Sequence, residues 1–239
     1  EACLVGSEMC IRDRCTGVLE SDSLALVDFY YAVGGDLLEQ NGGWLEAPVS
    51  EWYGITLSDD SCSVKEINLS SQGLQGSIPD LNLPNLKILN LSGNQFSGTI
   101  PDFNLPKLKQ LISQSNDLTG QIPNFTNLVI LEWLFLHDNQ LSGEIPNFNL
   151  PHLKTLGLYN NQLIGSIPDF SKLFNLIVFD AKNNQLSGEI PNFNLPSLQN
   201  FLVCPNNLTG NIPSFNNCLD LNASEIDFSC VMSAKTTGT

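Results

Sequence analysis

Positive charge is scarce in this 239-residue sequence, which has 10 Lys and Arg residues against 25 Asp and Glu residues and a formal net charge of −15. Such an acidic surface repels phosphate backbones and anionic lipid head groups, so we expect no binding to nucleic acid or to a membrane surface. The sequence also lacks any apolar run near the roughly 18 residues of a membrane-spanning helix. We therefore expect no membrane insertion.

Motifs that mark catalytic or metal sites are missing as well. The sequence contains no G-x-S-x-G, H-E-x-x-H or C-x-x-C motif, no phosphate-binding glycine loop, and only two histidines, His137 and His152. His137 and Asp138 could form an acid/base or metal cluster with Asp180, but three scattered polar residues give a weak signal. We expect a protein that is not an enzyme and that needs no cofactor or metal.

The N-terminus lacks both an initiating Met and an apolar signal segment, so we interpret Glu1 as the start of a mature or truncated chain. Residues 5–14, VGSEMCIRDR, resemble an adapter sequence translated in frame. If they are an artefact, Cys10 is lost and six cysteines remain. The alternative is a genuine N-terminus with one spare thiol, and no functional argument depends on this stretch.

Cysteine is absent from the middle of the chain, since nothing lies between Cys62 and Cys204. Disulfides are typical of secreted proteins, and the end-clustered cysteines suggest two stapled caps. Five N-x-[ST] sequons point the same way, although an Asn- and Ser-rich chain also spells sequons by chance; they are Asn68, Asn90, Asn124, Asn207 and Asn222. We expect an extracellular location (secreted, cell surface or matrix) and covalent N-glycans.

An internal repeat dominates the sequence. The segment NQLSGEIPNFNLP occurs at residues 139–151 and again at 184–196. These copies belong to a series of units of 22 or 23 residues, and two such units together make the 45-residue offset. The units begin at Val64, Leu86, Leu108, Leu131, Leu153, Leu176 and Leu198.

Each unit follows the pattern L-x-x-L-x-L-x-x-N-x-L-x-G-x-I-P-x-F, and the best copy spans residues 86–103. This pattern resembles the plant-type leucine-rich repeat. The resemblance implies an α/β-type repeat solenoid: a right-handed coil with short parallel strands on a concave face, an irregular convex side and a helical N-terminal cap. We divide the chain into an N-terminal segment and cap (1–63), seven repeats (64–220) and a C-terminal cap and tail (221–239).

The recurring positions have structural roles. The alternation in L-x-L predicts a short strand with one face inward. An Asn column that includes Asn139 is expected to satisfy the turning backbone, and the following glycines permit the bend that starts the return path. A Phe column that includes Phe148 is expected to form a buried spine. These columns define a solenoid and indicate no ligand.

The N-terminal cap is predicted from residues 21–35, where Ser21 or Asp22 would cap a helix that ends at Gly34 and Gly35. The following segment resembles the N-terminal cap of many leucine-rich-repeat proteins. This resemblance implies that Trp44, Trp52 and Tyr53 cover the open edge of the first coil.

Within this resemblance, we expect one disulfide at each end of the solenoid. The pairs are Cys15 with Cys62 and Cys218 with Cys230. No partner is assigned to Cys3, Cys10 or Cys204.

Function is expected on the variable strand positions, because the fixed positions build the coil. The later units carry apolar and aromatic residues there, and such strips are typical of interfaces. The predicted contact surface consists of Ile112, Trp133, Phe135, His137, Tyr159, Asp180 and Lys182. The alternative is an incidental apolar surface without a partner.

The sequence supports two functions. The first is a secreted interaction scaffold that binds a protein partner or copies of itself and assembles into an extracellular matrix or fibril, favoured by the near-identical units. The second is a ligand-recognition module, similar to receptor ectodomains or to secreted inhibitors of wall-degrading enzymes, that binds on the concave face. We favour the first on the sequence alone.

Overall fold

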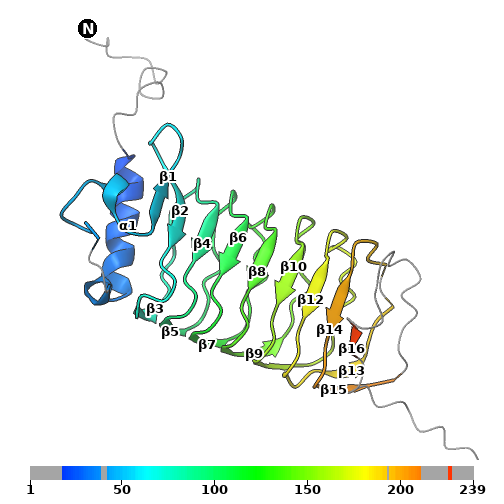
Figure 1. The fold of residues 1–239 in the computed structure, drawn as a ribbon. Helices are drawn as coiled ribbons and strands as arrows, with labels where there is room; N and C mark the ends of the chain where they lie inside the picture. The colour runs from blue at the N-terminus through cyan, green and yellow to red at the C-terminus, as the bar shows by residue number, and fades with distance from the viewer. Residues whose placement is uncertain (1–17, 39–41, 193, 211–225, 228–239) are drawn as a thin grey trace, which may run out of the picture.

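The structure is a computed structural model that describes residues 18–38, 42–192, 194–210 and 226–227. The coils stack in chain order away from the N-terminal helix (Figure 1), and each predicted repeat contributes one strand to a long nine-stranded sheet. The solenoid prediction is therefore confirmed. The long sheet contains β1 (Ile55–Leu57), β2 (Val64–Asn68), β4 (Ile88–Asn90), β6 (Gln110–Ile112), β8 (Trp133–Phe135), β10 (Thr155–Gly157), β12 (Val178–Asp180), β14 (Asn200–Leu202) and β16 (Ile226–Asp227).

The strands of the long sheet pair in parallel, except that β1 runs antiparallel to β2. Parallel pairing places equivalent residues of successive units side by side, as with Leu111 and Leu134. From β4 to β14, the middle residue of each strand of the long sheet is buried, and both neighbours of Leu134 are half-buried. The leucines thus form the core while their neighbours line the outer surface of the long sheet, as the L-x-L pattern predicts.

The Asn column links each coil to the one before it, as predicted. Asn116 is representative: its Oδ1 accepts from the backbone N–H of Phe96 (3.0 Å), and its Nδ2 donates to the carbonyl of Leu91 (3.0 Å). The same amide also donates to Ser113 of its own coil (3.2 Å). Since these backbone groups have no strand partner at the turn, the side-chain amide satisfies them. The column comprises Asn94, Asn116, Asn139, Asn161, Asn184 and Asn206.

A second parallel sheet, which the sequence analysis missed, follows the Asn turn along one flank of the solenoid (Figure 1). The L-x-G segment provides its strands, and Gly98 has a φ of 77°, which bends the chain where the strand ends. This flank sheet consists of β3 (Gln75–Ser77), β5 (Gln95–Gly98), β7 (Asp117–Gly120), β9 (Gln140–Glu144) and β11 (Gln162–Ile164); β13 (Ser187–Glu189) pairs separately with β15 (Asn207–Thr209).

Phenylalanines form the predicted buried column on the return path of each coil. Phe103, Phe125, Phe148 and Phe170 are each at most 1% exposed. The rings of Phe125 and Phe148 stack with centroids 6.4 Å apart. Phe193 and Phe215 lie outside the described residues. All four rings belong to one continuous hydrophobic core that neighbouring repeats share.

The N-terminal helix α1 (Glu20–Ala32) lies at the end of the long sheet beyond β1 (Figure 1). The predicted capping by Ser21 or Asp22 is wrong, because the helix begins earlier, with Leu19 at the N-cap and no side-chain cap. Asp22 is instead buried in the first helical turn, and its carboxylate accepts from the backbone N–H of Val64 (2.8 Å). This bond fastens the helix to the first strand of the repeats.

Two short 3₁₀ helices, η1 (Gly35–Leu37) and η2 (Val49–Glu51), complete the N-terminal cap. Trp44 and Trp52 are buried and stack with ring centroids 4.7 Å apart. Tyr53 differs from the expectation, because it is 39% exposed; its hydroxyl accepts from Gln72 Nε2 of the first coil (3.4 Å).

Cys62 and Cys204 are each disulfide-bonded. Cys204, to which the sequence analysis gave no partner, is thus part of a disulfide. Cys15, Cys218 and Cys230 lie outside the described residues, so the two predicted pairings remain predictions. Within the described part of the chain, no helix is long and apolar enough to span a bilayer.

Candidate functional site

The predicted contact surface lies on four neighbouring coils of the long sheet, from β6 to β12. Ile112, Trp133, Phe135 and Asp180 lie on strands, whereas His137, Tyr159 and Lys182 lie just after the ends of β8, β10 and β12. The register aligns Phe135 with Ile112 on one side and with Gly157 on the other, while Trp133 aligns with Thr155. The seven predicted residues are all half-buried, so each presents part of its side chain to solvent. We call Trp133, Phe135, His137 and Tyr159 the aromatic patch.

Gly157 makes room for the patch. It occupies the position between the two leucines of L-x-L, where a side chain would project beside Phe135. A Cβ placed on Gly157 would lie 3.1 Å from Phe135 Cδ1 and 3.5 Å from His137 Cδ2. The two rings therefore lean over β10 rather than standing straight from their own strand. The missing side chain is what brings Phe135 and His137 toward the next coil.

His137 links the patch across two coils. Its ring stacks on Tyr159 with centroids 4.1 Å apart and planes 14° apart, and it meets Phe135 edge-on at 6.1 Å. Burial lowers the pKa of His137 below its ordinary value, although the nearby carboxylates of Asp138 and Asp180 act in the opposite direction. Burial also raises the pKa of Tyr159. The stacked pair is therefore neutral at neutral pH.

Two lysines border the patch, one above each large ring. The Nζ of Lys154 lies 5.7 Å from the centroid of Trp133, and that of Lys182 lies 5.7 Å from the centroid of Tyr159. Cation–π contacts of this length are attractive and hold the rings in place. Lys182 also pairs with Asp180 (3.3 Å), so these two predicted residues form one ion pair at the edge of the patch.

Glu132 supports the Trp133 end of the patch from the preceding position. Its carboxylate accepts from Lys154 (2.6 Å) and Lys109 (3.0 Å), and these two bonds lower the pKa of Glu132. The Glu132 carboxylate, next to Trp133 in the chain, thereby holds Lys154 over the Trp133 ring. Sequence reasoning missed Lys154 and Glu132 because they precede the strands, in a column that was not among the variable strand positions considered.

The polar cluster considered from the sequence is only partly assembled. His137 Nδ1 lies 3.2 Å from Asp138 Oδ2, while Asp180 is paired with Lys182. Asp138 Oδ1 also accepts from Asn160 Nδ2 (2.5 Å). In the part of the chain that the structure describes, no group of three or more His, Cys, Asp or Glu side chains could hold a metal ion.

The predicted glycosylation sites fall on two surfaces. Asn68 and Asn90 are register partners on β2 and β4, at the end of the long sheet away from the patch. Asn124 and Asn207 are exposed, Asn124 on the return path after β7 and Asn207 at the start of β15. Asn222 lies outside the described residues.

Comparison with known proteins identifies the class. Family models described as Leucine Rich repeats (2 copies) and Leucine Rich Repeat match residues 131–172 and 85–104. The structure of a pollen receptor kinase 3 is 36% identical, covers 59% of this chain and 72% of that chain, and has a TM-score of 0.55. The chain belongs to the leucine-rich-repeat family.

Other similar structures include a plant hormone receptor and a complex from Arabidopsis thaliana. The plant peptide hormone receptor RGFR1 in complex with RGF2 is 37% identical over 66% of this chain, with a TM-score of 0.63. The BIR3–SERK2 complex from Arabidopsis thaliana is 28% identical over 69% of this chain and 94% of that chain, with a TM-score of 0.54. This chain spans only 27% of the length of the hormone receptor. A search of the curated proteins gives no significant match.

Proposed function

We propose that this protein is an extracellular, non-enzymatic recognition module that binds a polypeptide on the aromatic patch. The observation that carries the proposal is the clustering of four partly exposed rings on two adjacent coils. Trp and Tyr are enriched among the residues that dominate binding energy. Here the rings are fixed by stacking and by lysines, so little side-chain freedom remains to be lost on binding.

The kind of partner follows from the patch and from the relatives. RGFR1 is described in complex with RGF2, and BIR3 in complex with SERK2. A flat aromatic surface on a parallel sheet, edged by Lys154 and Lys182, suits an extended peptide or a protein surface with apolar and acidic groups. An extracellular location is supported by the disulfide-bonded Cys62 and Cys204.

The proposal can be tested without knowing the natural partner. A phage-displayed random peptide library is selected on the immobilised wild-type protein, and the selected peptides are measured against Trp133→Ser/Phe135→Ser. We expect at least tenfold weaker binding to the double variant, since hot-spot residues contribute about 2 kcal/mol or more each. Val129→Ser, which changes another partly exposed apolar residue, serves as the control and should bind as wild type.

Two results would contradict the proposal. One is a set of selected peptides that bind wild type and the double variant equally, and the other is an absence of selected peptides altogether. Circular dichroism of the double variant should match that of wild type, because both changed side chains lie outside the leucine core.

Self-assembly into a matrix or fibril is the second candidate. The duplicated segment at 139–151 and 184–196 favours it, because identical units present identical surfaces at a fixed spacing. The similar structures make recognition the better-supported function. Electron microscopy of the purified protein separates the two: ordered filaments would favour assembly, and a monodisperse monomer at high concentration would favour recognition.

A further inference from the structure

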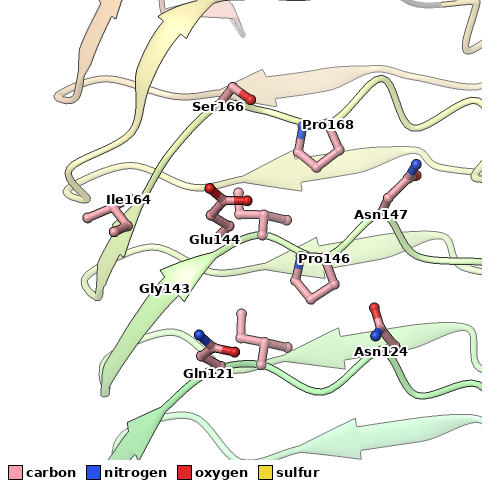
Figure 2. Close-up of a pocket in the computed structure, with 11 residues that line it drawn as sticks. Gln121, Asn124, Gly143, Glu144, Pro146, Asn147, Ile164, Ser166 and Pro168 are labelled. Atoms are coloured by element: carbon pink, nitrogen blue, oxygen red, sulfur yellow. The ribbon is translucent and has the colours of Figure 1, made fainter.

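The flank of the solenoid carries a surface hollow of about 620 Å³, away from the aromatic patch. Three successive coils line it, with the segment after β7 and with the last residues of β9 and of β11 and the segments that follow them (Figure 2). Its volume falls within the roughly 300–1,000 Å³ typical of small-molecule sites. Unlike the patch, the hollow contains one member of a glycosylation sequon, Asn124.

We propose that the hollow seats the inner sugars of an N-glycan attached to Asn124. Asn124 and Thr126, the two specific residues of the sequon, are both exposed, so the acceptor is accessible. Figure 2 shows Asn124 at one edge of the hollow and Ile164 diagonally across from it, with Pro146 between them and Pro168 further along, on the coil of Ile164. A sugar chain that starts at Asn124 therefore has a path across the hollow.

The lining has the mixed character that a sugar requires. Apolar groups, which can cover the C–H face of a sugar ring, come from the half-buried Pro146 and Pro168 of the I-P steps, while Ile122 and Ile145 are buried beside them. Polar groups come from Gln121, Glu144 and Asn147, which supply amide and carboxylate partners for hydroxyls. Most small-molecule sites combine apolar walls with a few polar groups in this way.

The polar side chains of the hollow lie flat along its floor. A Cβ placed on Gly143 would meet Gln121 Cγ at 2.8 Å, and one on Gly165 would meet Glu144 Cγ at 2.8 Å. Gln121 and Glu144 thus cross the glycines of the following coils. This arrangement keeps the hollow open while presenting its hydrogen-bonding groups along its length.

Ile164 is an independent sign of an apolar occupant. It stands immediately before the glycine of its repeat and is 47% exposed. Five of the other six repeats place a small hydroxyl residue at this position, and the first has Gln75; the five are Ser97, Thr119, Ser142, Ser187 and Thr209. A large apolar side chain at the rim of the hollow, in a column that is otherwise polar, has no role in the core.

Because the glycan is covalently attached, weak contacts with the hollow are sufficient to keep it seated. A tethered ligand has an effective concentration of about 1 mM, so an intrinsic dissociation constant of about 0.1 mM keeps it seated about nine-tenths of the time. The seated glycan would cover this flank and leave the long sheet open to a partner. The proposal requires only that the protein passes through a glycosylating secretory pathway. It does not depend on binding at the aromatic patch.

The test uses the full chain secreted from a glycosylating eukaryotic host. Peptide mass spectrometry should find Asn124 occupied in wild type and unoccupied in Thr126→Ala, which retains the Asn. Peptide N-glycosidase is then added to the native protein, and release at Asn124 is compared with release at Asn207. We expect about tenfold slower release at Asn124 while the glycan is seated, which corresponds to about 1.4 kcal/mol.

Ile164→Ser should accelerate release at Asn124 severalfold and leave Asn207 unchanged. Val129→Ser, which alters a residue that is also 47% exposed, is the matched control and should change neither rate. An unoccupied Asn124 overturns the proposal, and so do release rates that are equal at both sites and unaffected by Ile164→Ser. In NMR spectra of protein carrying ¹³C-labelled glycan, contacts between sugar protons and the Ile164 methyls should be present, and their absence would contradict the proposal.

Discussion

The imidazole of His137 stacks on the ring of Tyr159, one coil further along the solenoid, with centroids 4.1 Å apart. The two residues occupy the same column of successive repeats, so parallel pairing of β8 and β10 brings them together. Burial lowers the pKa of His137, which favours the neutral ring in this stack. Protonation of His137 at lower pH would therefore add a positive charge to the patch.

Acidification should weaken the fold through His137. The unfolded chain protonates this side chain near pH 6.5, while the folded state resists protonation. The contribution of His137 is thus fully present above about pH 7 and declines as the pH falls through the unfolded pKa toward the lower folded pKa. Urea midpoints of wild type and His137→Gln, measured across this range, should converge at low pH.

The other histidine provides the control for this experiment. His152 is exposed and belongs to a different column, so His152→Gln should keep the pH dependence of wild type. If the urea midpoints of wild type and His137→Gln changed with pH by the same amount, burial of His137 would not be coupled to stability.

Gly157→Ala should disturb the patch more than the fold. The φ of Gly157 lies outside the left-handed region, so alanine fits the backbone, but the added Cβ would lie 3.1 Å from Phe135 Cδ1. The ring of Phe135 must move by a few tenths of an ångström. We expect less than about 1 kcal/mol of destabilisation and weaker binding of the peptides selected on wild type.

Binding is measured by surface plasmon resonance and stability by thermal unfolding. Leu202→Ala changes the same column two coils away and should leave peptide binding intact, because Asp180 lies between Leu202 and Gly157 in the column. Unaltered binding to Gly157→Ala would mean that the position of the Phe135 ring does not matter to the partner.

Asn139→Ala should be strongly destabilising. The Asn139 side chain accepts from the N–H of Leu118 (3.0 Å) and donates to the carbonyls of Ser113 (3.0 Å) and Leu136 (3.1 Å). Each buried backbone group left without a partner costs about 1–3 kcal/mol, so we expect a loss of about 2–4 kcal/mol in the free energy of unfolding.

Urea titration of Asn147→Ala supplies the comparison for Asn139→Ala. Asn147 is exposed on the return path, and its replacement should stay within about 0.5 kcal/mol of wild type. Similar losses for both variants would contradict the assigned role of the Asn column.

Asp22→Ala should loosen the cap. The buried carboxylate accepts from the N–H of Val64 at 2.8 Å, across 42 residues of sequence. Hydrogen bonds to charged groups contribute about 1.5–3 kcal/mol, so amide hydrogen exchange in α1 should accelerate and the unfolding midpoint should fall. Asp28→Ala, on the exposed side of the same helix, should leave both unchanged. Equal exchange rates in the two variants would argue against this link.

Much of the fold could be predicted from the sequence because each position of the repeat recurs in every unit. Leu134, Asn139 and Phe148 recur at fixed offsets, and each position has one physical role that its spacing reveals. The flank sheet was missed because its L-x-G segments are too short to show strand periodicity. The capping error at α1 arose because Asp22 looks like a cap in sequence, while its true partner, Val64, lies far along the chain.

The sequence by itself determined the coil, its stacking and the outward placement of Trp133, Phe135 and Tyr159, since these follow from a period of 22 or 23 residues. Only the tertiary structure decided that the rings of Phe135 and His137 lean over Gly157, that Lys154 covers Trp133, and that Asn124 borders a hollow. The reason is physical: periodicity fixes which side of the coil a residue occupies, whereas side-chain directions and the spaces between coils depend on packing against neighbours that the sequence places a full repeat away.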